Sequence, residues 1–206
     1  MPTVNLNKQV VESLLGKKVP LEKLKDRISM LGTALQEISD KEITVEIFPS
    51  RPDMLSEQGF ARALSSFMNI KKGIQKYIVH KSGFSCKVEK TLDVWPYTVT
   101  AIVKDLKFNH ERIREVMQLQ EKLGTTLTRN RKKGGIGIYP LDKIKFPIRF
   151  TTMKLNEIKF RPLEAKEEMT GFEILQKHPT GKKYSYILGN EKEHPIFIDA
   201  NNKIMS

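Results

Sequence analysis

The chain has 206 residues, a formal net charge of +12 and an apolar fraction of 39%. This length can bury a core and fits one large domain or two small ones. No apolar stretch approaches the roughly 18 residues that a membrane helix needs, and the N-terminus lacks the pattern of a secretory signal, so we expect a cytoplasmic protein without a membrane span. The positive charge favours a polyanionic partner, but RNA, DNA, acidic lipid and acidic protein are all compatible with it.

The N-terminal part of the sequence predicts a small α/β domain. Apolar residues at helical spacing indicate helices over 7–15 and 20–31, each followed by a glycine. Strict alternation of apolar and polar residues over 42–48 indicates a half-buried strand, which the two following prolines interrupt. A third helix is expected to begin after Ser56, whose hydroxyl can cap it, and to end near Gly73.

A basic, less periodic stretch over 71–83 is the expected boundary between two domains, over 1–75 and 76–206. The second domain is predicted to be mixed α+β. Its expected elements, in chain order, are strands over 85–89 and 97–104, a helix over 109–127 that packs on a sheet, a loop entering a strand over 129–138, a strand over 148–154, a short helix opened by a Thr170–Glu173 capping box, and strands over 184–188 and 195–199.

The most basic segment of the chain lies over 129–133 and is followed at once by two glycines. Its cations can neutralise phosphates, and the glycines let a polyanion backbone approach closely; they are Arg129, Arg131, Lys132 and Lys133. A solvated run of charges without a ligand is the alternative interpretation. Aromatic side chains that could stack on bases are few, and the nearest three are more often core residues: Tyr139, Phe146 and Phe150.

Signatures of common enzyme sites are missing. Gly181-Lys182-Lys183 lacks the other residues of a phosphate-binding loop, and the chain has no nucleophile elbow around a serine. Cys86 is the single cysteine, which excludes an internal disulfide, and the four histidines lack the spacing of a zinc site. The sequence therefore predicts no catalytic residue, no metal site and no cofactor bound by this chain.

Several motifs follow one another in the order found in one known family. They begin with the Arg51-Pro52-Asp53 turn and its following helix, and they lie over 51–63, 117–123, 129–139, 141–144, 168–170, 178–184 and 195–206. Together they resemble the beta subunits of archaeal and eukaryotic phenylalanine–tRNA ligases, in the N-terminal domain and most of the editing domain. One local departure is Ser50, where the family usually has asparagine.

This resemblance implies a role in phenylalanyl-tRNA aminoacylation, through tRNA binding and hydrolytic editing of mischarged tyrosyl-tRNA. It also implies an alpha subunit as partner in a heterotetramer, with ATP and magnesium used by the holoenzyme outside this chain. A hydrolytic site is useful because a pocket built for phenylalanine rejects an added hydroxyl poorly. By the same resemblance, Phe197, where the family usually has an aliphatic residue, and Ser206 belong to the editing pocket.

In the family the chain continues beyond the position of Ser206 with strands that complete the pocket, so we expect a truncated editing domain. Two alternatives stay open. The chain could be a non-catalytic tRNA-binding or assembly module, or a freestanding editing hydrolase whose pocket another chain completes.

Overall fold

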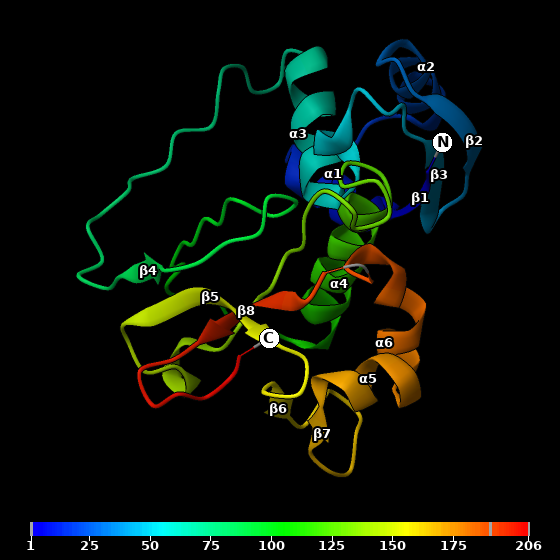
Figure 1. Cartoon of the computed structure of the whole chain (residues 1–206). Coiled ribbons are helices and arrows are strands. Elements are labelled where there is room, and N and C mark those ends of the chain that lie inside the picture. Colours follow the sequence, from blue (N-terminus) through cyan, green and yellow to red (C-terminus); the bar gives the residue numbers. More distant parts are fainter. Residues whose placement is uncertain (1, 190, 206) are drawn as a thin grey trace. The chain divides into compact units, whose positions relative to one another are not determined.

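The computed structural model describes residues 2–189 and 191–205, which form two compact units of helices and strands (Figure 1). The first unit comprises Met1–Val79 and Lys107–Asn130, and the second comprises His80–Leu106 and Arg131–Ser206. The α+β class expected from the sequence is confirmed. The domains over 1–75 and 76–206 stay a prediction, because a compact unit is not necessarily a domain that folds alone.

The first unit is built on a three-stranded antiparallel sheet with strand order β1-β3-β2. Its elements are β1 (Thr3–Asn7), α1 (Lys8–Leu15), α2 (Leu21–Met30), β2 (Ala34–Ile38), β3 (Glu42–Glu46), the short 3-10 helix η1 (Pro52–Met54), α3 (Glu57–Phe67) and α4 (His110–Thr125). The three predicted helices and the predicted strand of this region are confirmed, and β1 and β2 add to them. Ser56 caps α3 as expected, since its hydroxyl accepts a hydrogen bond from Gly59 N at 3.2 Å.

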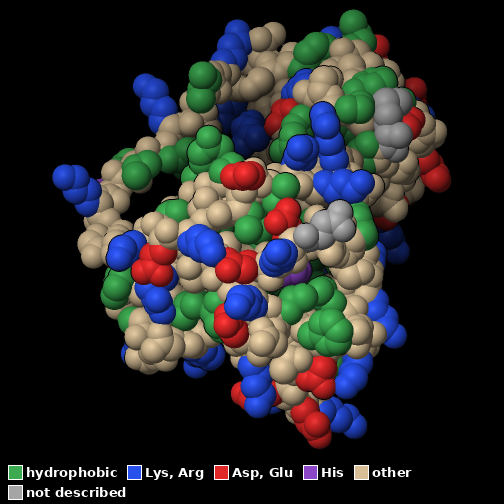
Figure 2. All heavy atoms as spheres, viewed as in Figure 1, with side chains coloured by type: hydrophobic (Ala, Val, Ile, Leu, Met, Phe, Trp, Pro, Cys, Tyr) green, Lys and Arg blue, Asp and Glu red, His purple; other side chains and the backbone are tan. Residues whose placement is uncertain are grey.

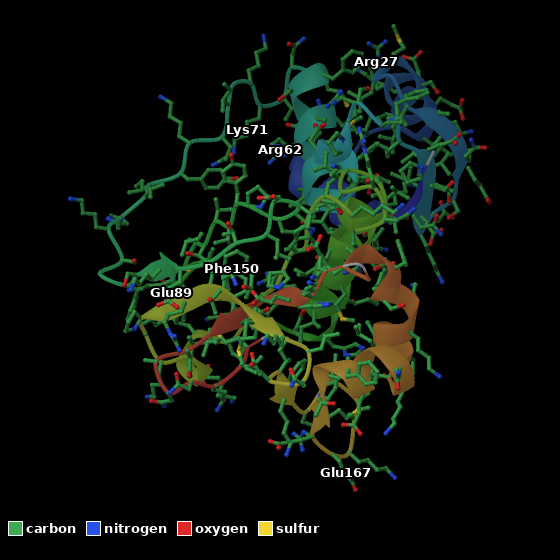
Figure 3. All side chains as sticks on the ribbon, in the orientation of Figure 1. Arg27, Arg62, Lys71, Glu89, Phe150 and Glu167 are labelled. Carbon is green, nitrogen blue, oxygen red and sulfur yellow. The ribbon has the colours of Figure 1, made fainter. Side chains whose placement is uncertain are left out.

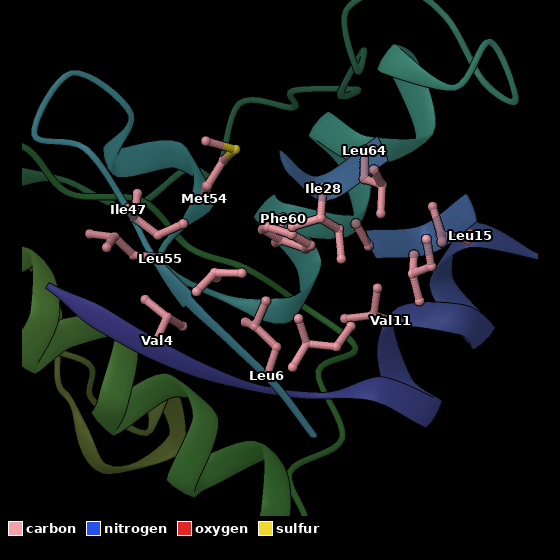
Figure 4. Close-up of a cluster of buried hydrophobic side chains, with 14 of the residues drawn as sticks. Val4, Leu6, Val11, Leu15, Ile28, Ile47, Met54, Leu55, Phe60 and Leu64 are labelled. Atoms are coloured by element: carbon pink, nitrogen blue, oxygen red, sulfur yellow. The ribbon is translucent and has the colours of Figure 1, made fainter. Parts of the chain in front are cut away.

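The core of the first unit contains the inward-facing residues of the sheet and the apolar stripes of its helices. Val4 and Leu6 on β1 are buried, and their neighbours in sequence are exposed, which is the period of a strand with one covered face. Phe60 and Leu64 on α3 are fully buried in the same cluster (Figure 4). Burial of each such large side chain contributes about 1.5–3 kcal/mol, so this cluster stabilises the unit.

Helix α4 returns the chain to this first core. Leu119 and Leu123 pack against the cluster, and the Gln58 side-chain amide donates a hydrogen bond to Glu115 at 3.1 Å. Asn109 caps the helix, as its side-chain oxygen accepts a hydrogen bond from Arg112 N at 2.9 Å. The predicted helix is therefore confirmed, but it packs against the core of the first unit and not, as the sequence suggested, on a sheet among the elements that follow residue 76.

In its described residues, the second unit contains two small sheets and two short α-helices. Its elements are β4 (Cys86–Val88), the 3-10 helix η2 (Leu141–Lys143), β5 (Ile148–Lys154), β6 (Lys159–Phe160), β7 (Met169–Thr170), α5 (Gly171–Lys177), α6 (Pro179–Tyr184), the 3-10 helix η3 (Ser185–Ile187) and β8 (Glu193–Ile198). The larger sheet has the order β4-β5-β8, with β4 parallel and β8 antiparallel to β5. No helix of the described residues is long and apolar enough to cross a membrane.

The capping box predicted at the start of α5 is present. The Thr170 hydroxyl accepts from Glu173 N at 3.2 Å, and the Glu173 carboxylate accepts from Thr170 N at 3.0 Å. Lys177 donates to the same carboxylate at 2.9 Å, and together these donors lower the pKa of Glu173 to about 2. The first turn of α5 is thus fixed by local hydrogen bonds.

Three predicted strands are wrong. The segment over 97–104 forms no strand, and its Tyr97 and Val99 are 89% and 95% exposed, because its alternating apolar residues find no partner strand in the described part of the chain. The segment over 184–188 is the end of α6 followed by η3, because Pro179 occupies the first turn of a helix. Residues 136–138 follow the basic loop without forming a strand. The strands predicted over 85–89, 148–154 and 195–199 are confirmed.

Candidate functional site

Phe197 lies in the middle of β8, directly opposite Phe150 on β5. The two ring centroids are 4.9 Å apart with an interplanar angle of 41°, a geometry typical of favourable aromatic pairs. Phe150 is buried and Phe197 is half-buried, and Phe150 lies next to Glu89, whose N–H donates to its carbonyl oxygen at 2.9 Å (Figure 3). Phe150 therefore supports the ring of Phe197, and Phe197 is the more accessible member of the pair.

The turn after β8 is organised by Asp199, a carboxylate that is only 2% exposed. Its Oδ1 accepts hydrogen bonds from Asn201 N and Lys203 N at 2.9 Å each, and its Oδ2 accepts from Lys145 N at 3.4 Å. The hydrogen bond from Lys203, with those from Asn201 and Lys145, lowers the pKa of Asp199 below its usual value. A charged carboxylate is therefore part of this turn.

This turn brings the chain back alongside Phe197. Ile204 pairs with Ile198 in an antiparallel bridge, and Met205 N donates to the Phe197 carbonyl oxygen at 2.8 Å. Ser206, the second pocket residue expected from the resemblance, lies outside the described residues. The hydrogen bond from Met205 thus ties the backbone of Phe197 to the segment that follows the Asp199 turn.

A polar cluster occupies the other end of β8. The Glu193 carboxylate accepts hydrogen bonds from Lys90, at 2.6 Å, and from the buried hydroxyl of Thr152. The hydrogen bond from Lys90 is the largest cause that lowers the pKa of Glu193, and burial lowers the pKa of the neighbouring His194. Within the described residues, no three His, Cys, Asp or Glu side chains gather closely enough to hold a metal ion. Through Thr152 and Lys90, Glu193 connects β8 to β5 and to the segment that follows β4.

Cations and tyrosines converge at a second place in the same unit. Arg131 Cζ lies 4.8 Å from the ring centroid of Tyr184, and Lys183 Nζ lies 5.1 Å from it. Lys132 Nζ lies 5.6 Å from the ring centroid of Tyr186. All three distances are within the range of cation–π attraction. We call these five residues the basic–aromatic surface.

The backbone before this surface has an uncommon conformation. Arg129, Asn130 and Arg131 have φ values of 52°, 55° and 65°, which is the left-handed region that non-glycine residues rarely adopt. Each such residue costs about 1–2 kcal/mol, so the surrounding structure has to impose the turn. Arg129 N and Asn130 N donate to the carbonyl oxygens of Thr126 and Thr125, both at 3.1 Å, after the last turn of α4. The basic segment is thus a defined turn rather than an irregular tail.

The structure distributes the four predicted RNA-binding residues over both units. Arg131 and Lys132 join the basic–aromatic surface, Lys133 is exposed next to them in sequence, and Arg129 belongs to the first unit. Figure 2 shows Lys and Arg side chains spread over the whole visible face and mixed with acidic ones, so charge alone does not locate a site.

The aromatic residues of this surface differ from the three candidates that the sequence suggested. Phe146 packs on Phe84 with centroids 4.3 Å apart, and the buried Phe150 packs on Phe197, so neither ring takes part in the cation–π contacts of this surface. The residues that meet the cations are Tyr184 and Tyr186, more than 50 positions further along the chain. The signal that could have revealed them is the sequence over 182–186, in which two adjacent lysines are followed closely by Tyr184 and Tyr186.

Comparisons with known proteins decide the family. The beta subunit of phenylalanine–tRNA ligase from Archaeoglobus fulgidus is 38% identical over 207 aligned residues, which cover 100% of this chain and 37% of the relative. The corresponding subunit from Methanosphaera stadtmanae is 34% identical with the same coverage. This chain is a relative of archaeal phenylalanine–tRNA ligase beta subunits. The resemblance found in the sequence motifs is therefore confirmed.

A solved structure supports the relationship at the level of the fold. It is the crystal structure of an N-terminal fragment of the phenylalanyl-tRNA synthetase beta subunit from Pyrococcus horikoshii, with a TM-score of 0.89 and 34% identity. The match covers 100% of this chain and 60% of that fragment. No family model matches the chain. Since the chain spans 37% of the length of the two beta subunits named above, their whole activity does not transfer to it directly.

Proposed function

We propose that the chain acts as the N-terminal part of a phenylalanine–tRNA ligase beta subunit, in which it binds tRNA and contributes to hydrolysis of mischarged tyrosyl-tRNA. The observation that carries this proposal is the relationship along the full chain at 34–38% identity to archaeal beta subunits. In such an enzyme, which is a heterotetramer by the family resemblance, the alpha subunit would contain the synthetic site, where ATP and magnesium are used. The part assigned to this chain is the recognition of mischarged tyrosyl-tRNA.

The half-buried ring of Phe197, which rests on Phe150, supports a role in that recognition. A tyrosine ring can pack against Phe197, as an aromatic pair favours offset or tilted contact. Its hydroxyl then needs a hydrogen-bond partner, because a buried hydroxyl without one is costly, and this requirement separates tyrosine from phenylalanine. On the family resemblance, we assign this partner to Ser206, which follows Asp199 in the sequence.

Deacylation measurements test the editing role. Tyrosyl-tRNA and phenylalanyl-tRNA are incubated with this chain and with a beta subunit extended to the length of its relatives. We expect selective hydrolysis of tyrosyl-tRNA by the extended subunit, little hydrolysis by the 206-residue chain, and loss of the activity in the extended Ser206→Ala variant. Ser82→Ala, at an exposed serine whose hydroxyl is hydrogen-bonded to the backbone of Phe84, is the matched control.

Each alternative gives a different result. If neither chain hydrolyses tyrosyl-tRNA but both bind tRNA, the chain is a non-catalytic tRNA-binding or assembly module. Full, tyrosine-selective hydrolysis by the short chain would show that its pocket is complete, which fits a freestanding editing hydrolase. An extended Ser206→Ala variant that edits normally would remove Ser206 from the pocket.

The basic segment is tested separately through the salt dependence of tRNA binding. Replacing Arg129, Arg131, Lys132 and Lys133 by alanine is expected to flatten the plot of log affinity against log salt, by roughly 0.7–0.9 for each phosphate that the variant no longer neutralises. The control replaces four exposed lysines of the second unit, namely Lys87, Lys143, Lys166 and Lys192. Equal slopes for the two variants would assign the segment to the solvated charges instead.

A further inference from the structure

The basic–aromatic surface combines two kinds of contact that one ligand has to satisfy. Tyr184 is half-buried and holds Arg131 and Lys183 against its ring, so it positions two cations. Tyr186 is 52% exposed and has the Lys132 ammonium group 5.6 Å from its ring centroid. A ligand at this place would meet an aromatic face and several positive charges within the same small area.

Unpaired nucleotides have the matching chemistry. Each carries a negative phosphate and a flat base, whereas in a duplex the faces of the bases are covered by their neighbours. Acidic polypeptides and acidic lipids offer the charge without a flat aromatic face. We propose that the basic–aromatic surface binds an unpaired stretch of RNA, with a base stacked on Tyr186 and phosphates held by Arg131, Lys132 and Lys183. The choice of RNA rests on the proposed function, and the stacking mode rests on the geometry.

The two tyrosines have different roles in this site. Tyr186 supplies the stacking surface, since about half of its side chain is accessible to a base. Tyr184 is a positioning residue, because its ring is in contact with cations from two separate segments of the chain. The left-handed turn that ends at Arg131 delivers the first of those cations, so the site depends on a backbone feature that precedes it.

Binding of short RNAs by fluorescence anisotropy tests the proposal. The probes are a labelled single-stranded oligouridine of about eight nucleotides, an abasic strand of the same charge, and a duplex RNA of the same length. The wild-type chain is expected to bind the oligouridine about tenfold more tightly than the abasic strand, as loss of base stacking predicts. This comparison changes only the ligand, so it does not depend on the folding of a variant.

Substitutions then locate the stacking residue. Tyr186→Leu is expected to weaken oligouridine binding about tenfold while leaving duplex binding unchanged, and Tyr186→Phe, which keeps the ring, should retain affinity. Tyr97→Leu is the matched control, because Tyr97 is an 89% exposed tyrosine in the same unit. Lys132→Gln should flatten the salt dependence by about 0.7, the value for one neutralised phosphate in a single strand.

Several outcomes would overturn the inference. These are equal affinity of the wild-type chain for the oligouridine and the abasic strand, equal effects of Tyr186→Leu and Tyr97→Leu, and binding of polyglutamate as tight as binding of oligouridine. If the chain still binds whole tRNA in any of these cases, the proposed function stands and only the stacking mode fails. A wild-type chain that binds no RNA of any kind would remove the tRNA-binding part of the proposed function as well.

Discussion

Asp199 shows how one buried side chain shapes the region around Phe197. Its carboxylate accepts hydrogen bonds from Asn201, Lys203 and Lys145, all through backbone N–H groups, and they stabilise the charged form. An amide at this position keeps the size of the side chain but loses the charge, and it can turn a donor towards a backbone donor. The turn that returns the chain to Phe197 therefore depends on the charge as well as on the shape.

The first prediction concerns the pH dependence of this contribution. Because the pKa of Asp199 is lowered in the folded chain, its contribution is fully present above the unfolded pKa, about 3.9, and is lost as the pH falls through the lower folded pKa. Asp199→Asn should lower the urea midpoint at pH 7, and the difference from the wild type should shrink towards pH 3. Urea unfolding at both pH values measures it.

The control for this prediction is Asp142→Asn. Asp142 is exposed and its ion-pair partner is the adjacent Lys143, so its removal should change neither midpoint noticeably. If Asp199→Asn lowers the urea midpoint equally at pH 3 and pH 7, the role of the charge is contradicted. Such a result would attribute the effect to packing alone.

At the scale of elements, the contact between α5 and α6 requires a glycine. A Cβ atom at the buried Gly181 on α6 would overlap the carbonyl group of Ile174 on α5. The backbones of the two helices can approach this closely only without a side chain at this position. Since Tyr184 ends α6, the same contact sets the place of the basic–aromatic surface.

The second prediction follows from this close approach of the two helices. Gly181→Ala should destabilise the chain by about 1–3 kcal/mol, the usual cost of overpacking, and should weaken RNA binding by displacing Tyr184. Gly135→Ala is the control, because a Cβ there would meet only the Trp95 side chain, at 3.4 Å. Chemical denaturation compares the two variants. A Gly181→Ala chain as stable as the control would show that the helices separate at little cost.

The third prediction concerns the exposed segment over 97–104. Val99 is 95% exposed and belongs to no strand, so Val99→Thr should change the free energy of unfolding by no more than about 0.5 kcal/mol. Ile196→Thr, which places a hydroxyl at a residue only 3% exposed, should be clearly destabilising. A cost of more than about 1 kcal/mol for Val99→Thr would show instead that the Val99 side chain is covered in solution.

At the scale of the whole molecule, both candidate sites lie in one of the two units, and the sequence has no phosphate-binding motif. Phe197 and the basic–aromatic surface both belong to the second unit, and the first unit contributes a separate core. The relatives named above are more than twice as long as this chain, which covers 37% of them. Amino-acid activation is therefore expected to need other parts of the enzyme.

The fourth prediction tests that division. The purified chain should give no phenylalanine-dependent exchange of pyrophosphate into ATP, because its sequence has no phosphate-binding motif. A complete enzyme with both kinds of subunit, assayed in parallel, should give the exchange. Exchange by the isolated chain that depends on phenylalanine would contradict the prediction.

The sequence by itself determined several local elements and the family. The alternation over 42–48, the Ser56 cap and the Thr170–Glu173 capping box depend on neighbouring residues only, and all three are present in the structure. The order of the motifs was sufficient to indicate the family, which the comparisons then confirmed.

Only the tertiary structure decided which segments meet. The apolar alternation over 97–104 does not become a strand, because pairing needs a partner that local sequence does not specify. The return of α4 to the first core, and the approach of Tyr184 and Tyr186 to the basic segment, both join residues about 50 or more positions apart. Such contacts depend on how the elements pack, so periodicity and spacing carry no information about them.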